Sequence, residues 1–211
     1  MRPFRLLLPL LLLAAGAAPA NAAPASGPDP DAALARLADY LRIDTTNPPG
    51  NESRAVEFLA AILAEAGIPF ETFEAAPGRG SIVARIEGGD APALLLLNHS
   101  DVVPADPGAW TVPPFSGEVR DGYLYGRGAL DTKGLAMIQL ESFLALHASG
   151  VRPDRDVLFA ATADEEAGGY FGAGWLVRQR PELVEDVGFV LNEGGGGRLV
   201  GRTPVFRVEV T

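Results

Sequence analysis

A histidine and an aspartate follow directly on an apolar run, in the stretch Leu-Leu-Leu-Leu-Asn-His99-Ser-Asp101. His99 is one of only two histidines in the chain. If the extended conformation of the run continues, the side chains of His99 and Asp101 face the same side. A metal-binding imidazole commonly bonds a carboxylate through its other nitrogen, which makes Asp101 a candidate partner for His99. Taken alone, however, the pair is more typical of a histidine with a structural role.

Acidic residues follow two further apolar runs, where strands are predicted to end. Glu165 and Glu166 belong to an acidic triplet after residues 156–163, and Glu193 follows residues 187–192. An acidic run is commonly a solvated face, but this triplet comes directly after a predicted buried strand. In open α/β sheets, ligands bind beyond the carboxyl ends of the strands. All three apolar runs therefore deliver potential metal ligands to one edge of a sheet.

The two adjacent glutamates are expected to have different roles. Like charges at a buried strand end repel one another unless a cation is present. Because neighbouring side chains point in different directions, one glutamate can bind a metal while the other moves a proton. The sequence thus offers Glu165 and Glu166 as a base and a ligand.

Asp131 lies in Gly-Arg-Gly128-Ala-Leu-Asp131-Thr-Lys133-Gly134, just before a predicted helix. One interpretation is a helix N-cap, a common role for aspartate. A dinucleotide-binding loop is excluded because Asp131 occupies the required third glycine position, and a phosphate loop is excluded because no glycine precedes Lys133. A carboxylate at this point could instead bridge two metal ions.

The composition limits the kind of metal site. The chain has no cysteine, so any site must use histidine and carboxylates. One histidine with three or four carboxylates suits one or two zinc ions. Two zinc ions bridged by Asp131 and a water would supply a nucleophilic hydroxide near neutral pH.

Hydrophobic periodicity predicts the elements that position these residues. Helices are predicted over residues 29–43, 52–66, 135–146 and 172–180, and strands over 70–75, 81–88, 93–99, 156–163, 187–193 and 205–210. The alternation of helices with apolar strands predicts a three-layer α/β/α domain with a mostly parallel sheet. The strands over 93–99, 156–163 and 187–193 are expected to be buried, and the last strand is expected at an edge.

The first residues differ in character from the rest of the chain. Residues 1–22 combine two arginines, an apolar run and a closing Ala20-Asn21-Ala22, which predicts a cleaved secretory signal. An uncleaved membrane anchor is the alternative for this segment. Residues 23–28 are expected to form a linker, residues 29–211 the domain, and the protein is expected to be secreted or periplasmic. The net charge is −10 without a basic stripe, which argues against a nucleic-acid partner.

The motifs resemble those of the zinc exopeptidase and deacylase family that includes acetylornithine deacetylase, succinyl-diaminopimelate desuccinylase, the glutamate carboxypeptidases and carboxypeptidase S. The resemblance rests on NHSDVVPADPGAW, PPFSG, DGYLYGRGALDTKG, TADEEAGG and NEGG, in that order. The sequences of these motifs most closely resemble the carboxypeptidase S branch. The resemblance covers the chain from about Leu34 to its end.

The resemblance implies a role for each candidate residue. Metal ligands would be His99, Asp131, Glu166 and Glu193, with Asp131 bridging two zinc ions and followed by a cis peptide. Glu165 would be the general base and Asp101 would orient His99. Cobalt or manganese could replace zinc. The small departure is Asn98, where the family often has glycine.

The larger departure is that the family's late histidine ligand and its lid domain have no counterpart before Thr211. His147, within a predicted helix, is expected at the surface and not as a ligand. We therefore expect an N-terminal part of a catalytic domain that is incomplete at its C-terminus and inactive alone.

The resemblance implies a secreted hydrolase that cleaves an amide bond of peptides or N-acyl amino acids with a free carboxylate. The alternatives are a two-zinc aminopeptidase and an inactive truncated fragment that binds metal or supplies an interface. A small peptide or N-acyl amino acid is the expected partner, without a stable membrane anchor, and a homodimer of the complete protein stays open.

Overall fold

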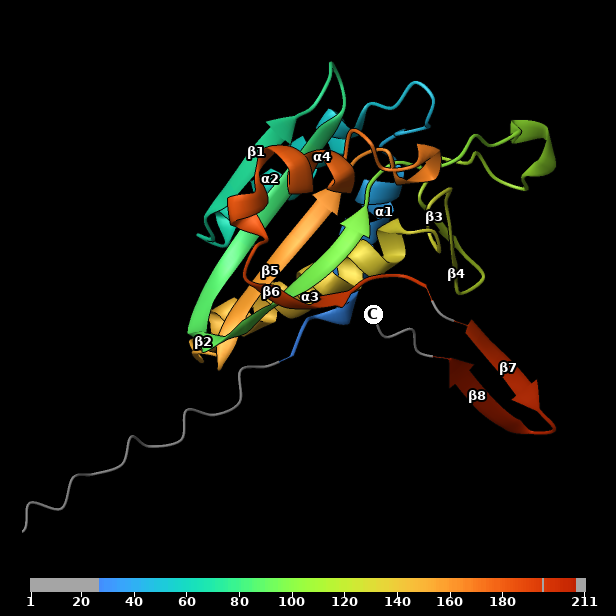
Figure 1. Ribbon diagram of the computed structural model, residues 1–211. Coiled ribbons are helices and arrows are strands. Elements are labelled where there is room, and N and C mark those ends of the chain that lie inside the picture. The colour runs from blue at the N-terminus through green and yellow to red at the C-terminus, as the bar shows by residue number, and fades with distance from the viewer. Residues whose placement is uncertain (1–26, 195, 208–211) are drawn as a thin grey trace, which may run out of the picture.

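The computed structural model describes residues 27–194 and 196–207, and the predicted signal segment lies outside them. Helices and strands alternate over most of this range (Figure 1). The strands of the main sheet are β1 (Phe70–Glu74), β2 (Gly80–His99), β5 (Arg155–Thr162) and β6 (Val187–Leu191). The longer helices are α1 (Pro30–Leu41), α2 (Glu52–Glu65), α3 (Lys133–Ser149) and α4 (Ala173–Gln179).

The predicted strands 81–88 and 93–99 are two legs of one continuous strand, β2. In its second leg Leu94 lies opposite Val157 and His99 opposite Thr162, so this leg runs parallel to β5. In its first leg Ile82 lies opposite Ala161, with the partner residue falling as β2 advances, so that leg runs in the opposite direction. β5 therefore lies between the two legs, as Figure 1 shows.

Two glycines allow β2 to pass around the start of β5. A Cβ atom on Gly88 would lie 2.1 Å from the carbonyl oxygen of Arg155, and one on Gly89 would lie 2.6 Å from that of Asp154. The N–H of Gly89 donates to the carbonyl of Pro153 at 2.9 Å. Because the turn keeps its backbone bonded to this segment, one strand continues where two separate strands were predicted.

The sheet has parallel and antiparallel pairings. β1 pairs antiparallel with the first leg of β2, from Phe70 opposite Ala84 to Glu74 opposite Gly80. β6 pairs parallel with the second leg, with Leu96 opposite Leu191. The parallel part is therefore the part that ends at His99. This parallel part is where the carboxyl-end rule for ligand sites applies.

Helices cover both faces of the sheet, which confirms the three-layer α/β/α prediction. α1, α2 and α3 lie behind the sheet in Figure 1, and α4 lies in front of it. The larger core joins the helices behind to the sheet through side chains such as Tyr40, Leu59, Leu140 and Phe159. A second core packs Leu176 of α4 against the other face.

The predicted helices are confirmed with small differences in their ends. α1 begins at Pro30, with Asp29 as its N-cap accepting a hydrogen bond from the N–H of Asp31 at 3.0 Å. α3 is longer than predicted at both ends, and His147 is exposed in its last turn, as expected. Along the part of the chain that the structure describes, no helix combines the length and apolarity needed to cross a bilayer.

The prediction that the strand over residues 187–193 is buried is wrong. β6 lies at the edge of the sheet, and Phe189, Val190 and Leu191 are each more than half exposed. An apolar run predicts burial only if neighbours cover both of its faces. Beyond β6 the described chain supplies no further strand to the main sheet.

Two hairpins stand apart from the main sheet. β3 (Glu118–Arg120) pairs with β4 (Tyr123–Tyr125), and β7 (Gly196–Val200) pairs with β8 (Thr203–Arg207). The strand predicted over residues 205–210 corresponds in part to β8, and its last residues lie outside the described range. The other three hairpin strands were not predicted from the sequence.

Candidate metal centre

His99 is the last residue of β2 and is 1% exposed. The leucine run before it fills the two cores, since alternate side chains of a strand point to opposite faces. Parallel pairing of His99 with Thr162 places the ends of β2 and β5 side by side. The residues that follow both strands are therefore neighbours in space, as the carboxyl-end rule predicted.

Asp101 holds one side of the imidazole. Nδ1 of His99 lies 3.3 Å from Oδ1 of Asp101 and 3.0 Å from its backbone carbonyl oxygen. Asp101 is fully buried, and its carboxylate also accepts the backbone N–H groups of Glu165 and Glu166, both at 3.1 Å. One carboxylate thus orients the imidazole and the turn that carries the two glutamates.

Carboxylates converge on the other imidazole nitrogen. Nε2 of His99 lies 3.1 Å from Oδ1 of Asp131 and 3.1 Å from Oε1 of Glu193. Oε2 of Glu165 is 3.8 Å from the same nitrogen. One ligand atom each from His99, Asp131 and Glu193 lie within 4.8 Å of one another, a spacing at which the three could hold one ion.

The charges around His99 change its pKa. Burial alone would lower the pKa, but the hydrogen bond and charge of Asp101, with Glu193 and Glu165, raise it to about 9. Burial raises the pKa of Glu193, and Asp131 and Glu165 add to this effect. The carboxylates around Nε2 thus favour a positive charge at this point, which a proton or a metal ion can supply.

Asp131 precedes α3 but is not its N-cap. The N-cap is Thr132, which makes no side-chain capping bond, and the peptide between Asp131 and Thr132 is cis, as the family resemblance implied. Lys133 is fully buried and its Nζ donates to the carbonyls of Tyr40 and Ile43 at 3.2 and 2.6 Å. These bonds anchor the start of α3 to the end of α1, which leaves the Asp131 carboxylate directed to His99.

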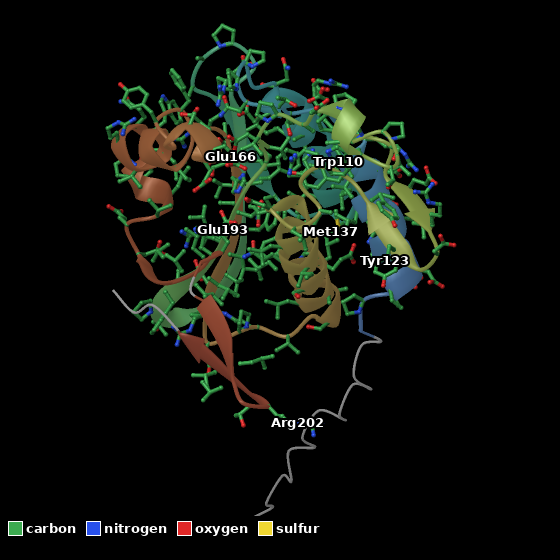
Figure 2. The ribbon with its side chains drawn as sticks, turned by 90° about the vertical axis from the view of Figure 1, so that its right-hand side faces the viewer. Trp110, Tyr123, Met137, Glu166, Glu193 and Arg202 are labelled. Atoms are coloured by element: carbon green, nitrogen blue, oxygen red, sulfur yellow. The ribbon has the colours of Figure 1, made fainter. Side chains whose placement is uncertain are left out.

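The two glutamates of the acidic triplet after β5 differ in how far they are exposed to solvent. The side chain of Glu165 is 53% exposed, whereas Glu166 is half-buried and its Oε1 has no hydrogen-bond partner. Burial raises the pKa of Glu166, and the charge of Asp131 adds to it. Figure 2 shows Glu166 and Glu193 on separate segments beside β2. Glu166 is outside the three-residue group around His99, although it faces the same acidic neighbours.

Asp164, the first residue of the triplet, has a φ of 71° and turns away from the cluster. Its carboxylate accepts from Arg79 at 2.6 Å and from the N–H of Phe171 at 3.0 Å. Arg79 also pairs with the fully buried Glu52 at 2.9 Å. Asp164 therefore belongs to a buried ionic network beneath the site.

This buried network also includes Asn47, and it was not predicted from the sequence. Nδ2 of Asn47 donates to Oδ2 of Asp101 at 2.8 Å, and its Oδ1 accepts from Nη1 of Arg79 at 3.2 Å. Glu52 begins a predicted helix, whereas Asn47 and Arg79 lie outside every predicted helix and strand. The only available signal was the position of Asn47 in Thr-Asn-Pro-Pro-Gly, which by itself indicates a turn.

The residues at the end of β2 fit a divalent metal ion. The group combines one imidazole with at least two carboxylates, a ligand set suited to zinc. The buried and unpartnered Oε1 of Glu166 lies in the same acidic surroundings and is a ligand atom without a protein donor. Acidic groups crowded in this way are stable together only when a cation or protons offset their charge.

Comparisons with known proteins identify relatives of this chain. Residues 95–210 match the model of "Peptidase family M20/M25/M40". The N-fatty-acyl-amino acid synthase/hydrolase PM20D1 of Xenopus tropicalis is 43% identical over 119 residues, which cover 56% of this chain and 23% of that protein. Aminoacylase-1 of Sus scrofa is 36% identical over 172 residues, which cover 80% of this chain and 42% of that protein.

The fold is also found in solved structures. The M20 family metallo-carboxypeptidase of Sulfolobus solfataricus has a TM-score of 0.62 and 24% identity, with 78% of this chain and 37% of that chain covered. The chain thus spans less than half the length of the relatives and of the structure named here.

Proposed function

Because the chain belongs to peptidase family M20/M25/M40, we propose that the protein is a metal-dependent hydrolase that cleaves the amide bond of an N-acyl amino acid or small peptide with a free carboxylate. The observation that carries the proposal is the convergence of Asp131 and Glu193 on Nε2 of the buried His99. The names of two relatives, an aminoacylase and an N-fatty-acyl-amino acid synthase/hydrolase, support the substrate class.

The geometry supports one ion held by His99, Asp131 and Glu193. The family resemblance adds Glu166 as the ligand that would hold a second ion, with Asp131 as the shared ligand. Zinc is the proposed metal, with cobalt or manganese as substitutes, because imidazole and carboxylates are the donors present. When bound, zinc supplies Lewis acidity to the amide carbonyl and lowers the pKa of water.

Glu165 is the proposed general base. Its carboxylate lies beside His99 but outside the group of three ligand atoms, and more than half of its side chain is exposed. It can therefore reach a substrate without being consumed as a ligand. In this role Oε2 of Glu165 takes the proton from the attacking water and passes it to the leaving amine.

Three finer assignments are proposals of the same kind. We propose that the protein belongs to the carboxypeptidase S branch, because its motif sequences are most similar to that branch. We also propose that the complete protein forms a homodimer. We also propose a secreted or periplasmic location, because residues 1–22 have the pattern of a cleaved signal. Mass spectrometry of the exported protein should give a first residue close to Ala23, and a mature protein that retains Leu6–Leu13 would exclude cleavage.

Paired substrates test the proposed activity. The complete protein is assayed with N-acyl amino acids of short and long acyl chains, with dipeptides, and with the same compounds carrying a carboxamide in place of the carboxylate. We expect hydrolysis of the carboxylates, at least about tenfold slower hydrolysis of the carboxamides because the charged contact is lost, and loss of activity on chelation that zinc restores. Unchanged activity in protein shown to be metal-free would contradict the proposal.

A further inference from the structure

Asn47 is positioned between two groups of opposite hydrogen-bonding character. An arginine only donates and an ionised carboxylate only accepts. Oδ1 of Asn47 accepts from Nη1 of Arg79 at 3.2 Å, and Nδ2 donates to Oδ2 of Asp101 at 2.8 Å. The orientation of the amide is therefore fixed by its partners. Nδ2 also donates to Oδ1 of Asp164 at 3.4 Å. A rotation that exchanged oxygen and nitrogen would lose all three hydrogen bonds.

The main chain around Asn47 is tied to the segment that carries Asp101. The N–H of Asn47 donates to the carbonyl of Val102 at 2.9 Å, and the N–H of Val102 donates to the carbonyl of Thr45 at 3.2 Å. The hydroxyl of Thr45 donates to the carbonyl of Ser100 at 2.6 Å. These bonds, on both sides of Asp101, leave little freedom between the Asn47 amide and the Asp101 carboxylate.

Asp101 in turn fixes three parts of the candidate centre. Its carboxylate contacts Nδ1 of His99 and accepts the N–H groups of Glu165 and Glu166. Each oxygen of Asp101 accepts one of these two N–H groups, and the Asn47 amide adds a second donor to Oδ2. Nδ1 of His99 lies close to Oδ1, so both carboxylate oxygens of Asp101 have hydrogen-bonding partners. These hydrogen bonds fix the rotation of the carboxyl group.

We propose that Asn47 is a positioning residue: its amide holds the Asp101 carboxylate in the rotation that aims the His99 imidazole and the Glu165–Glu166 turn into the centre. Arg79, held by Glu52 and Asp164, serves this role by orienting the Asn47 amide. The proposal rests on the proposed function only in treating His99 as a ligand. The hydrogen-bond geometry that it invokes is independent of any reaction.

Two substitutions separate positioning from space-filling. In Asn47→Asp the side chain keeps its shape and its bond to Arg79 but presents an acceptor to Asp101, so the bond becomes a repulsion. In Asn47→Ala the space and the bond are both lost. Positioning predicts that Asn47→Asp disturbs His99 at least as much as Asn47→Ala. A role in packing alone predicts that Asn47→Ala disturbs His99 more than Asn47→Asp does.

The histidines supply the readout. The chain has only His99 and His147, and His147 is exposed near the end of α3. NMR spectra that correlate ring protons with ring nitrogens therefore give one signal set for the site and one for an internal control. Thr46→Val is the matched variant, since it removes a side-chain hydrogen bond to Asp44 in the same loop without touching Asp101.

We expect the His99 nitrogen signals to shift or lose intensity in Asn47→Asp and Asn47→Ala, with His147 unchanged in both and Thr46→Val resembling the wild type. Titration with Co²⁺ should give a dissociation constant about tenfold higher in both Asn47 variants, the lower end of the loss seen when a partner of a metal-bound histidine is disturbed. His99 signals that stay at their wild-type positions in Asn47→Asp would overturn the proposal. A protein that hydrolyses no substrate would refute the proposed function and leave this NMR result intact.

Discussion

Nδ1 of His99 lies 3.3 Å from Oδ1 of Asp101, and both side chains are buried almost completely. The contact leaves the opposite nitrogen as the only ring atom directed to the acidic residues around it. A histidine with a purely structural role would be satisfied by Asp101 alone. The approach of Asp131 and Glu193 to Nε2 is what distinguishes this site from that alternative.

Substitution of Asp101 tests the orientation of His99. Asp101→Asn keeps the shape of the side chain but removes the charge and leaves one oxygen to serve the donors around it. Metal affinity should fall by about 10–100-fold, as for other carboxylates that orient a metal-bound histidine. Isothermal titration with zinc measures this change. An unchanged affinity would show that Asp101 is not needed to aim the imidazole.

The adjacent glutamates should respond differently to the same substitution. In the complete protein, Glu165→Gln removes a base but no ligand, so zinc content should be kept while turnover falls by about 10²–10⁴-fold. Glu166→Gln replaces a ligand by a neutral and poorer donor, so metal content should fall first. Zinc analysis beside activity for each variant distinguishes the roles. If Glu165→Gln lacks metal and Glu166→Gln retains it, the two assignments are reversed.

Arg85 should contribute to stability in a pH-dependent way. The N–H of Gly88, together with Arg85, lowers the pKa of Asp156, and the Arg85 hydrogen bonds lower the pKa of Asp186. A lowered folded-state pKa stabilises the fold above the ordinary value of about 3.9, and this contribution is lost as the pH falls through the lowered value. The urea midpoint of unfolding should therefore fall less in Arg85→Met than in the wild type when the pH is lowered from about 5 to about 2.

Arg42→Met is the control for that experiment, because Arg42 contacts Asp39 at the exposed surface. Its urea midpoints should follow the wild-type dependence on pH. If the urea midpoints of Arg85→Met and the wild type fall equally over this pH range, Arg85 does not have the assigned role in the pH dependence of stability.

The turn in β2 should not tolerate a side chain at Gly88. A Cβ atom there would lie 2.1 Å from the backbone oxygen of Arg155, so the two segments must separate. Gly88→Ala should lower the free energy of unfolding by about 1–3 kcal/mol, the usual cost of overpacking. Gly27→Ala, with nothing within 4 Å of the added atom, is the matched control. Equal stability of the two variants in urea unfolding would contradict the close passage of β2 around β5.

The positions of His99 and Glu193 could be predicted because each follows an apolar strand, and parallel strands bring their carboxyl ends together. The Asp101 contacts with the N–H groups of Glu165 and Glu166 could not, because they depend on the conformation of a three-residue turn after β5. The same limit applies to Arg79, whose partners Glu52 and Asp164 are far from it in the sequence.

The fold class followed from periodicity, but two features of the sheet did not. Gly88 and Gly89 indicate a break in a strand when only local preference is considered, whereas here they permit a close backbone approach that keeps β2 continuous. β6 has an apolar sequence, and its exposure depends on which neighbours cover it, a property that composition does not contain.

The central claim is that His99, Asp131 and Glu193 hold a metal ion, and anomalous X-ray scattering from zinc-loaded crystals tests it most directly. Data collected on both sides of the zinc absorption edge locate the ion without reference to activity. The account predicts an anomalous peak about 2.0–2.2 Å from Nε2 of His99 and from oxygens of Asp131 and Glu193. Zinc-loaded crystals with no peak at Nε2 of His99, or with the peak at His147, would contradict it.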